Sequence, residues 1–285
     1  KRIEIARRAL QKKVNQATKE IRQQKEEIEQ KNKNITSSIE YGQRIQNAIL
    51  PPKSGIKNVL PDSFVLFKPR DIVSGDFYWF NDDKEHTIVI VADCTGHGVP
   101  GAFMSMIGNT LLNEIIKEMK ITEPDEILKH LDRHVKNALT QGKEENDTGD
   151  GMDISICKID KKENKLYFAG ARNSMVVIYN DKLKIIEANR FAIGGKSFVK
   201  RRKRFTTKEL PVEKGTCCYL FSDGYSDQTG GANGKKIKSG RFIQLLNDIH
   251  KEKMDQQYVI LNDKLNKWMD GYTQRDDILV IGFRL

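Results

Sequence analysis

The sequence predicts an α+β fold in which antiparallel sheets are covered by helices and preceded by one long helix. Three observations lead to this prediction. Residues 1–50 contain no proline and repeat apolar residues every seven positions. Short apolar runs typical of strands, such as "HTIVIVAD", begin near residue 63 and recur to the end of the chain. These runs are interrupted by pairs of helical segments, whereas a parallel sheet would alternate strand with helix.

The N-terminal segment is predicted to be a helix with a coiled-coil seam. The apolar a positions of its repeat, with Gly42 in one slot, are Val14, Ile21, Ile28, Ile35 and Ile49. The d positions are mixed, with Leu10, Ala17 and Ile45 apolar and Gln24, Lys31 and Ser38 polar. A single amphipathic helix packed on the domain also fits, but the length and the polar remainder favour a two-stranded coiled coil. We expect residues 1–50 to be a linker that forms a homodimer, and residues 51–285 to form the folded domain.

The predicted elements then follow in order along the chain. "LPP" at 50–52 ends the first helix, because Pro51 disfavours helical geometry at the residue before it. Strands are predicted at 63–71, 75–80 and 86–93, followed by helices at 101–119 and at 123–139 with Thr122 as N-cap. A polar loop at 141–151 precedes four strands at 152–159, 165–170, 174–180 and 184–188. The last elements are a strand at 217–224, helices at 241–250 and 256–269, and a strand at 276–285.

Composition restricts the class of protein. The 285 residues are 38% hydrophobic and 31% charged, and no apolar run approaches the ~20 residues of a membrane span, so we expect no membrane contact from this segment. The net charge is +10, but residues 1–50 hold 12 Lys/Arg and 6 Asp/Glu, which places +6 on the helix. A second basic cluster, "KRRKR" at 200–204, also lacks interleaved aromatic residues, so we expect no nucleic-acid partner.

The cysteines indicate a reducing compartment. Cys94, Cys157, Cys217 and Cys218 include no C-x-x-C pair, and Cys217 and Cys218 should face opposite ways in one strand. We therefore expect neither a zinc site nor a disulfide framework. Reduced cysteines are typical of the cytoplasm, and we expect a cytoplasmic location. Because the chain begins at Lys1 and not at a methionine, we expect an upstream sensor region, which a membrane could hold, to be missing from it.

Aspartates at the ends of predicted strands are the candidate functional residues. They are Asp76 in "SGDFYWF", Asp93 in "VADCTGHG", Asp223 in "FSDGYSD" and the Asp276–Asp277 pair in "QRDDILVIG". A carboxylate beside a buried strand is costly unless a positive group neutralises it. Two divalent cations would neutralise four carboxylates, and all-oxygen ligands favour Mg²⁺ or Mn²⁺ over zinc. The glycines after Asp93 would leave room for metal and phosphate. For any one aspartate alone, a turn or helix-cap role is the simpler interpretation.

Four motifs in this order resemble the SpoIIE-like branch of the metal-dependent PPM (protein phosphatase 2C type) serine/threonine phosphatases. The motifs are "SGDFYWF", "VADCTGHGVPGAFMS", "FSDGYSDQTGG" and "RDDILVIGFRL". The match covers about residues 60–285, and the preceding "SSIEYGQRIQNAILPP" resembles the helix that leads into such domains. The resemblance implies an α-β-β-α sandwich of two antiparallel sheets flanked by helices, with two Mn²⁺ or Mg²⁺ ions at one end.

The resemblance also implies roles for single residues. Asp76 binds one metal, Asp93 bridges both, the backbone carbonyl of Cys94 reaches one of them, and Asp223 and Asp276 complete the other. Hydroxide held between the metals attacks the phosphorus of phosphoserine or phosphothreonine, so no covalent phosphoenzyme is needed.

Other polar residues near the predicted metal ligands each have two possible roles. His97 is a general acid or, with better support from its spacing, a loop-structuring residue. Asp150 and Asp153 are candidates for a third metal site, against the simpler reading of carboxylates in a mobile loop. Asp277 supports its neighbour or caps the strand, and Arg70 touches the substrate phosphate or has a structural role.

The implied function is hydrolysis of phosphoserine or phosphothreonine on a regulatory protein, as the output module of a bacterial sensor. By resemblance, the substrate is a STAS-type anti-sigma-factor antagonist, and the entering helix controls activity through segment 99–119. A pseudophosphatase scaffold that binds a phosphoprotein without turnover is the alternative, against which the retention of all four aspartates argues. A basic coiled-coil nucleic-acid binder is the third hypothesis.

Overall fold

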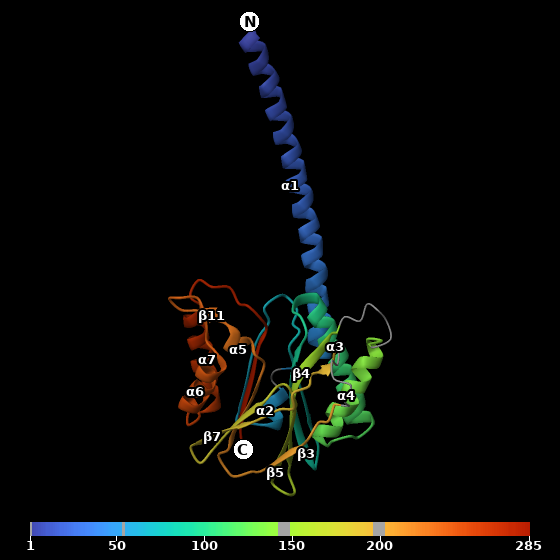
Figure 1. Cartoon of the computed structure of the whole chain (residues 1–285), viewed down its shortest axis with the longest axis vertical. Helices are drawn as coiled ribbons and strands as arrows, with labels where there is room; N and C mark the ends of the chain where they lie inside the picture. Colours follow the sequence, from blue (N-terminus) through green and yellow to red (C-terminus); the bar gives the residue numbers. More distant parts are fainter. Residues whose placement is uncertain (1, 53–54, 142–148, 196–202) are drawn as a thin grey trace. The chain divides into compact units, whose positions relative to one another are not determined.

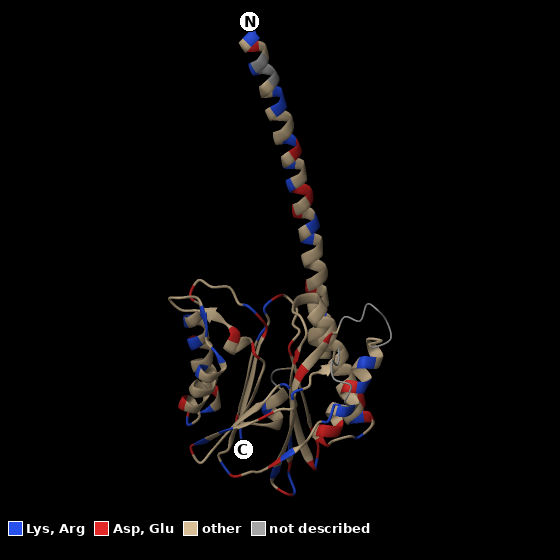
Figure 2. Cartoon of the chain, viewed as in Figure 1, with Lys and Arg blue, Asp and Glu red and all other residues tan. Residues whose placement is uncertain are grey.

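The computed structural model describes residues 2–52, 55–141, 149–195 and 203–285. By internal packing the chain divides into two compact units after Arg44. Helix α1 (Arg2–Ile49) is continuous across this division and ends just before the two prolines, as predicted (Figure 1). Positive and negative residues are interspersed along α1 (Figure 2), and pairs one turn apart, such as Arg22 and Glu26, form ion pairs. None of the helices in the described ranges is long and apolar enough to cross a membrane.

Two antiparallel sheets form the centre of the second unit. The first has the order β1 (Ser63–Lys68), β13 (Ile278–Arg284), β10 (Cys217–Phe221), β6 (Met175–Tyr179) and β7 (Lys182–Ile186). The second has the order β2 (Phe77–Asp82), β3 (His86–Cys94), β4 (Gly151–Asp160), β5 (Lys165–Ala171) and β9 (Lys208–Pro211), with β8 (Ile193–Gly194) paired to β4. A separate small ribbon joins β11 (Thr229–Gly230) to β12 (Lys235–Lys236).

Helices cover the outer face of each sheet (Figure 1). The β2–β9 sheet carries α3 (Gly98–Leu112), the π-helical turn η1 (Asn113–Glu118) and α4 (Pro124–Ala138). The β1–β7 sheet carries α6 (Ser239–Ile249) and α7 (Met254–Met269). The short helices α2 (Gly55–Val59) and α5 (Gly224–Asp227) complete the unit. The predicted α-β-β-α sandwich is therefore confirmed.

Strand alternation explains why three cores form. Val89 and Val91 of β3 point into the core between the sheets, whereas Ile88 and Ile90 point to the core under α3 and α4. Residues two apart on a strand share a face, so a buried strand contributes one face to the core between the sheets and the other face to the core under its own helices. The adjacent cysteines follow the same rule, because Cys218 lies between the sheets and Cys217 lies under α6 and α7. They face opposite ways, as predicted.

Several local predictions need correction. Thr122 is not the N-cap of α4; the cap is Glu123, whose backbone is extended because Pro124 disfavours helical geometry at the preceding residue. The helix expected at 101–119 begins at Gly98 and becomes π-helical from Asn113, where the Asn113 side chain donates to the Asn109 carbonyl oxygen (2.9 Å). Most of the predicted 141–151 loop and part of the 200–204 basic cluster lie outside the described residues.

Candidate metal centre

The candidate centre begins with strand pairing in the β2–β9 sheet. Phe77 of β2 lies opposite Ala92 of β3, so Asp76 and Asp93 are neighbours at one end of that sheet. On the other side of β3, Asp93 lies directly opposite Asp153 of β4. Side chains directly opposite in an antiparallel pair have Cβ atoms about 5 Å apart. The register of three strands thus gathers three carboxylates.

The other sheet adds two aspartates at the matching end. Pairing of β10 with β13 extends past the strand to Ser222, whose backbone N–H donates to the Leu279 carbonyl oxygen (2.9 Å). Asp223 follows as the N-cap residue of α5, and Asp276 precedes β13. After burial, the charge of Asp223 is the main cause that raises the pKa of Asp93. Carboxylates from the two sheets therefore meet at the site.

The turn after Asp93 is short of side chains because backbone segments cross there. Gly96 has a φ of +83°, which glycine adopts most readily. A Cβ on Gly101 would lie 2.3 Å from the Gly96 carbonyl oxygen, and a Cβ on Gly75 would lie 2.5 Å from the same atom. The loop before β2, the turn after β3 and the start of α3 therefore meet backbone to backbone. The glycines therefore serve this packing, and the room that they leave for metal and phosphate stays a prediction.

A cavity of about 210 Å³ opens at this end of the two sheets. Residues 94–97 of the turn form one part of its wall. The other lining residues are Asp93, Asp153, Arg172, Asp223 and Asp276. Asp76 is not in the lining and is buried, with only 3% of its surface exposed. The structure thus brings together the four predicted aspartates, three at the cavity wall and one in the interior.

These carboxylates oppose each other's ionisation. Burial, and then the charge of Asp93, raises the pKa of Asp76 well above its usual value, although a hydrogen bond from Ser222 lowers it. Burial, followed by the charges of Asp223 and Asp276, raises the pKa of Asp93 to about 8. The Oδ2 atom of Asp76 is buried without a hydrogen-bond partner. A positive charge placed here would reverse these costs.

The donor chemistry fits hard divalent cations. Carboxylate and carbonyl oxygens are the ligands that Mg²⁺ and Mn²⁺ favour, and a buried, unpartnered oxygen is a ready ligand atom. In the described ranges no three Asp, Glu, His or Cys side chains are grouped so as to hold an ion.

Two of the neighbouring candidates line the cavity. The Nδ1 atom of His97 lies 2.9 Å from Oδ2 of Asp71, so a carboxylate orients the imidazole. Asp153 faces Asp93 across the strand pair. Asp150 is not among the lining residues, and its backbone carbonyl accepts hydrogen bonds from the Gln141 side chain (2.6 Å) and the Gly195 N–H (3.0 Å). Of the two candidates for a third metal site, only Asp153 is therefore a wall residue.

Asp277 has a structural role beside the cavity. Its buried carboxylate accepts hydrogen bonds from the backbone N–H groups of Arg70 and Gly75, both at 2.7 Å. Its own backbone N–H donates to Oδ1 of Asp276 (2.9 Å). Asp277 thus holds the loop that leads to Asp76 and supports its neighbour. The side chain of Arg70 is exposed and does not line the cavity.

Arg172 is a site residue that the sequence did not indicate. It lines the cavity in a left-handed backbone conformation (φ +58°), and its Nε atom lies 3.5 Å from Oδ2 of Asp153. This charge opposes the rise that burial causes in the pKa of Asp153. The β4–β5 pairing brings Arg172 to this position, because Ser155 lies opposite Gly170 and the same register continued by two residues sets Asp153 beside Arg172.

Gln46 is a second residue that sequence reasoning missed. It lies in the last turn of α1 and is 3% exposed. Its Nε2 atom donates to the Ser74 carbonyl oxygen (2.7 Å) and to Oγ of Ser105 (2.9 Å), and its Oε1 atom accepts from the Ser74 N–H. Gln46 therefore links the loop before Asp76 to α3. A polar residue beside the apolar Ile45 at the helix end was the available signal.

Comparisons with known proteins agree with this architecture. The family model described as "Stage II sporulation protein E (SpoIIE)" matches residues 83–285, a range that includes Asp93, Asp223 and Asp276 but not Asp76. The phosphoserine phosphatase RsbU of Bacillus subtilis (strain 168) is 26% identical over 197 residues, which are 68% of this chain and 54% of that protein. The chain therefore spans about half the length of this curated relative.

Solved structures show the same fold. The SiaA-PP2C domain of Pseudomonas aeruginosa superposes with a TM-score of 0.80 at 31% identity, covering 89% of this chain and 98% of that one. The PP2C phosphatase domain of SpoIIE from Bacillus subtilis, solved with a fragment of its regulatory domain, gives a TM-score of 0.61 at 17% identity. It covers 78% of this chain and 62% of that one, and at this identity the likeness concerns the fold alone.

Proposed function

The chain belongs to the SpoIIE family, and from this premise we propose that it is a metal-dependent protein serine/threonine phosphatase. One observation carries the proposal. Asp93 of β3 and Asp223, which follows β10 in the other sheet, line one cavity together with Asp153 and Asp276. A turn former or helix cap would not require carboxylates from both sheets to meet where their ionisation is unfavourable.

We propose that two Mn²⁺ or Mg²⁺ ions would be held by oxygen ligands. These ligands are the carboxylates of Asp76, Asp93, Asp223 and Asp276 and the backbone carbonyl of Cys94. When bound, such ions supply Lewis-acid activation of water and neutralise charge on the phosphoryl group. Asp153 is the proposed ligand of a third, weaker site, because it lines the cavity and its pKa is raised by burial.

The chain's own residues recognise and orient the substrate. Among the described residues of the cavity wall, Arg172 carries a guanidinium, and a guanidinium can bind two oxygens of a phosphate at once. The Cys94 thiol is buried, and burial followed by the charge of Asp76 raises its pKa well above the usual value. It therefore stays protonated and is not a nucleophile. His97, oriented by Asp71, structures the turn that forms the wall.

The proposed substrate is a phosphoserine or phosphothreonine on a STAS-type anti-sigma-factor antagonist. RsbU, the relative named above, is a phosphoserine phosphatase, which supports this substrate class. The protein would act in the cytoplasm as the output module of a sensor. Dimerisation through residues 1–50 is part of the proposal and rests on the exposed apolar a positions of α1 from Val14 to Ile35.

Hydrolysis assays test the proposal. Purified protein is given p-nitrophenyl phosphate, and then each phosphorylated STAS-domain protein from the same genome, with Mn²⁺ or with chelator. Manganese-dependent release of phosphate is expected from the small substrate and from at least one phosphoprotein. Binding of a phosphoprotein without any turnover, at saturating Mn²⁺, would instead identify a pseudophosphatase scaffold.

A further inference from the structure

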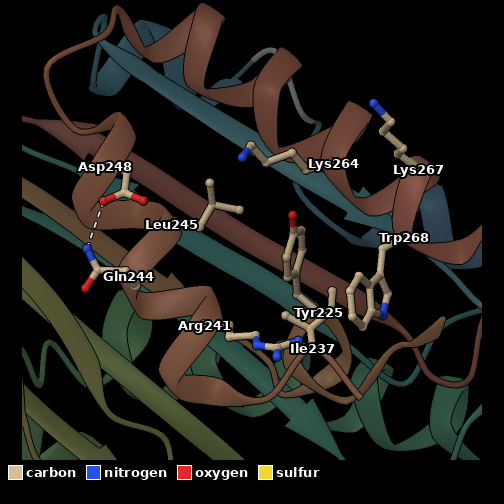
Figure 3. A pocket seen from close by; sticks show the side chains of 9 residues that line it. All are labelled: Tyr225, Ile237, Arg241, Gln244, Leu245, Asp248, Lys264, Lys267 and Trp268. Atoms are coloured by element: carbon tan, nitrogen blue, oxygen red, sulfur yellow. Dashed lines mark hydrogen bonds between the residues drawn. The ribbon is translucent and has the colours of Figure 1, made fainter. Parts of the chain in front are cut away.

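A second hollow lies on the outer side of the sandwich, away from the carboxylates. This α6–α7 groove has a volume of about 440 Å³ and is formed by α5, α6, α7 and the residue after β12 (Figure 3). Its apolar lining residues are Tyr225, Ile237, Leu245 and Trp268. A volume of this size accommodates one or two side chains of a bound segment.

Cations surround this apolar floor. Arg241 comes from α6, and Lys264 and Lys267 come from α7; Figure 3 shows Lys264 reaching over the groove toward α6. All three side chains are exposed. Among the described residues, the one acidic residue in the lining is Asp248, and it already accepts a hydrogen bond from Gln244 (2.8 Å). The groove is therefore positive at its rim and apolar at its base.

The aromatic rings of the groove are already packed. Tyr225 stacks on Phe242 with ring centroids 4.4 Å apart, and its hydroxyl donates to the Leu261 carbonyl oxygen (2.9 Å). The indole of Trp268 lies against the Arg241 guanidinium, 5.8 Å from the ring centroid. A Cβ on Gly231 would also lie 3.2 Å from that indole. The groove is therefore better suited to an aliphatic side chain than to stacking of a planar ring ligand such as a nucleobase.

The groove is connected to the candidate metal centre through short segments. The residue before α5 is Asp223, and Tyr225 lies in that helix. From the groove wall, the Trp268 Nε1 donates to the Gln228 carbonyl oxygen (3.3 Å). The Gln228 side chain accepts from the Arg275 N–H (3.1 Å), next to Asp276. Groove and centre therefore share α5 and the loop before β13.

We propose that the α6–α7 groove docks an acidic segment of the phosphoprotein substrate, with an aliphatic side chain on the apolar floor and flanking carboxylates on Arg241 and Lys264. This inference rests on the proposed phosphatase function and adds a recognition surface outside the metal centre. Charge complementarity selects this occupant, since three cations face one acidic side chain that is already hydrogen-bonded.

Fluorescence measures docking without any activity. The chain has two tryptophans, and Trp79 is buried with 1% exposure, so a change on titration reports Trp268. The probe is a 15-residue peptide of Glu and Asp with Leu at helical spacing, and its comparison has Gln and Asn at the acidic positions. Saturable binding of the acidic peptide alone is expected. Arg241→Glu with Lys264→Glu should weaken it at least about tenfold. Equal binding by that variant, or none by the wild type, would overturn the proposal.

A matched variant controls for charge. Lys182→Glu with Lys184→Glu makes the same change of charge at exposed positions on β7, and it should bind the acidic peptide as the wild type does. A second arm measures turnover of p-nitrophenyl phosphate and of the acidic peptide carrying one phosphoserine. The groove variant should raise KM for the phosphopeptide about tenfold and leave the small substrate unchanged. Peptide binding without turnover of either substrate by the wild type would refute the phosphatase function and keep the docking surface.

Discussion

Asp93 of β3 and Asp223, which follows β10 in the opposite sheet, line the same cavity, and burial followed by the charge of Asp223 raises the pKa of Asp93. The two sheets therefore meet at a point where carboxylates repel each other. Asp93 lies in a strand that pairs on both sides, with β2 and with β4, so the backbone fixes its position. The proposed metal centre is therefore built on a junction of the two sheets.

Asp93→Asn should be the most damaging single change to catalysis. The amide keeps one oxygen but loses the charge that is proposed to touch both ions. Turnover at saturating Mn²⁺ should fall by more than about 100-fold, because loss of a direct ligand should exceed the roughly 10–100-fold cost of replacing a residue that only supports a ligand. Asp223→Asn should also cost more than about tenfold with the fold intact by circular dichroism. Near-normal turnover by purified Asp93→Asn protein would disprove the assignment of the site.

The repulsion at Asp93 predicts how stability depends on pH in chelator. The folded state raises the pKa of this carboxyl from 3.8 to about 8, so between these values the folded protein binds more protons than the unfolded chain. The free energy of unfolding should therefore fall as pH rises through this window. The contribution of the protonated Asp93 carboxyl to that free energy is complete below the window and is lost above it.

Thermal melts with and without metal measure this effect. In chelator, Asp93→Asn should have a higher Tm than the wild type, by a margin that grows up to about pH 8. Added Mn²⁺ should raise the Tm of the wild type much more than that of the variant. A wild-type Tm that is independent of pH between 5 and 8 in chelator, and unmoved by Mn²⁺, would contradict both the repulsion and the metal site.

Cys94→Ala should be nearly silent in catalysis. The thiol packs among buried apolar residues, and only the backbone carbonyl is proposed to contact metal. Loss of the buried sulfur should lower the free energy of unfolding by about 1 kcal/mol. Steady-state kinetics check the first expectation and urea titration checks the second. A 100-fold loss of kcat in folded protein, roughly 2.7 kcal/mol of barrier, would indicate a chemical role for the thiol.

Ile21→Asp with Ile28→Asp should give a monomer. Both side chains are exposed, at 65% and 57%, and lie on the apolar seam of α1. A buried aspartate at an a position opposes coiled-coil pairing because its charge loses water. Light scattering measures the mass, and the phosphatase assay shows whether turnover changes.

The matched control places the same residues off the seam. Gln23→Asp with Gln30→Asp changes helix propensity and charge similarly without touching the a positions. It should keep the wild-type mass. If the seam variant remains a dimer, the coiled coil is not the interface. If it is monomeric with unchanged kinetics, the helix is a tether and does not regulate the domain.

Much of the fold was predictable because strand and helix periods are local. The alternation in β3, the proline stop after α1 and the Asp-Gly turn after β10 are each written in a few consecutive residues. The prediction that Thr122 is the N-cap of α4 was wrong, and the reason is also local. Pro124 disfavours helical geometry at Glu123, and this effect outweighed the preference of threonine for cap positions. The two-residue strands β8, β11 and β12 have too few residues to show any period.

The sequence by itself determined which aspartates end strands, that the strands pair antiparallel, and therefore that a carboxylate site is expected. Only the tertiary structure decided which distant residues join them. It placed Asp153 opposite Asp93, brought Arg172 to the wall, left Asp150 out of it, and directed Asp277 to the backbone of the Arg70 loop. The reason is physical. Side-chain periodicity is set by neighbours in the chain, whereas register and loop contact depend on packing between distant segments, which for Arg70 and Asp277 lie 207 positions apart.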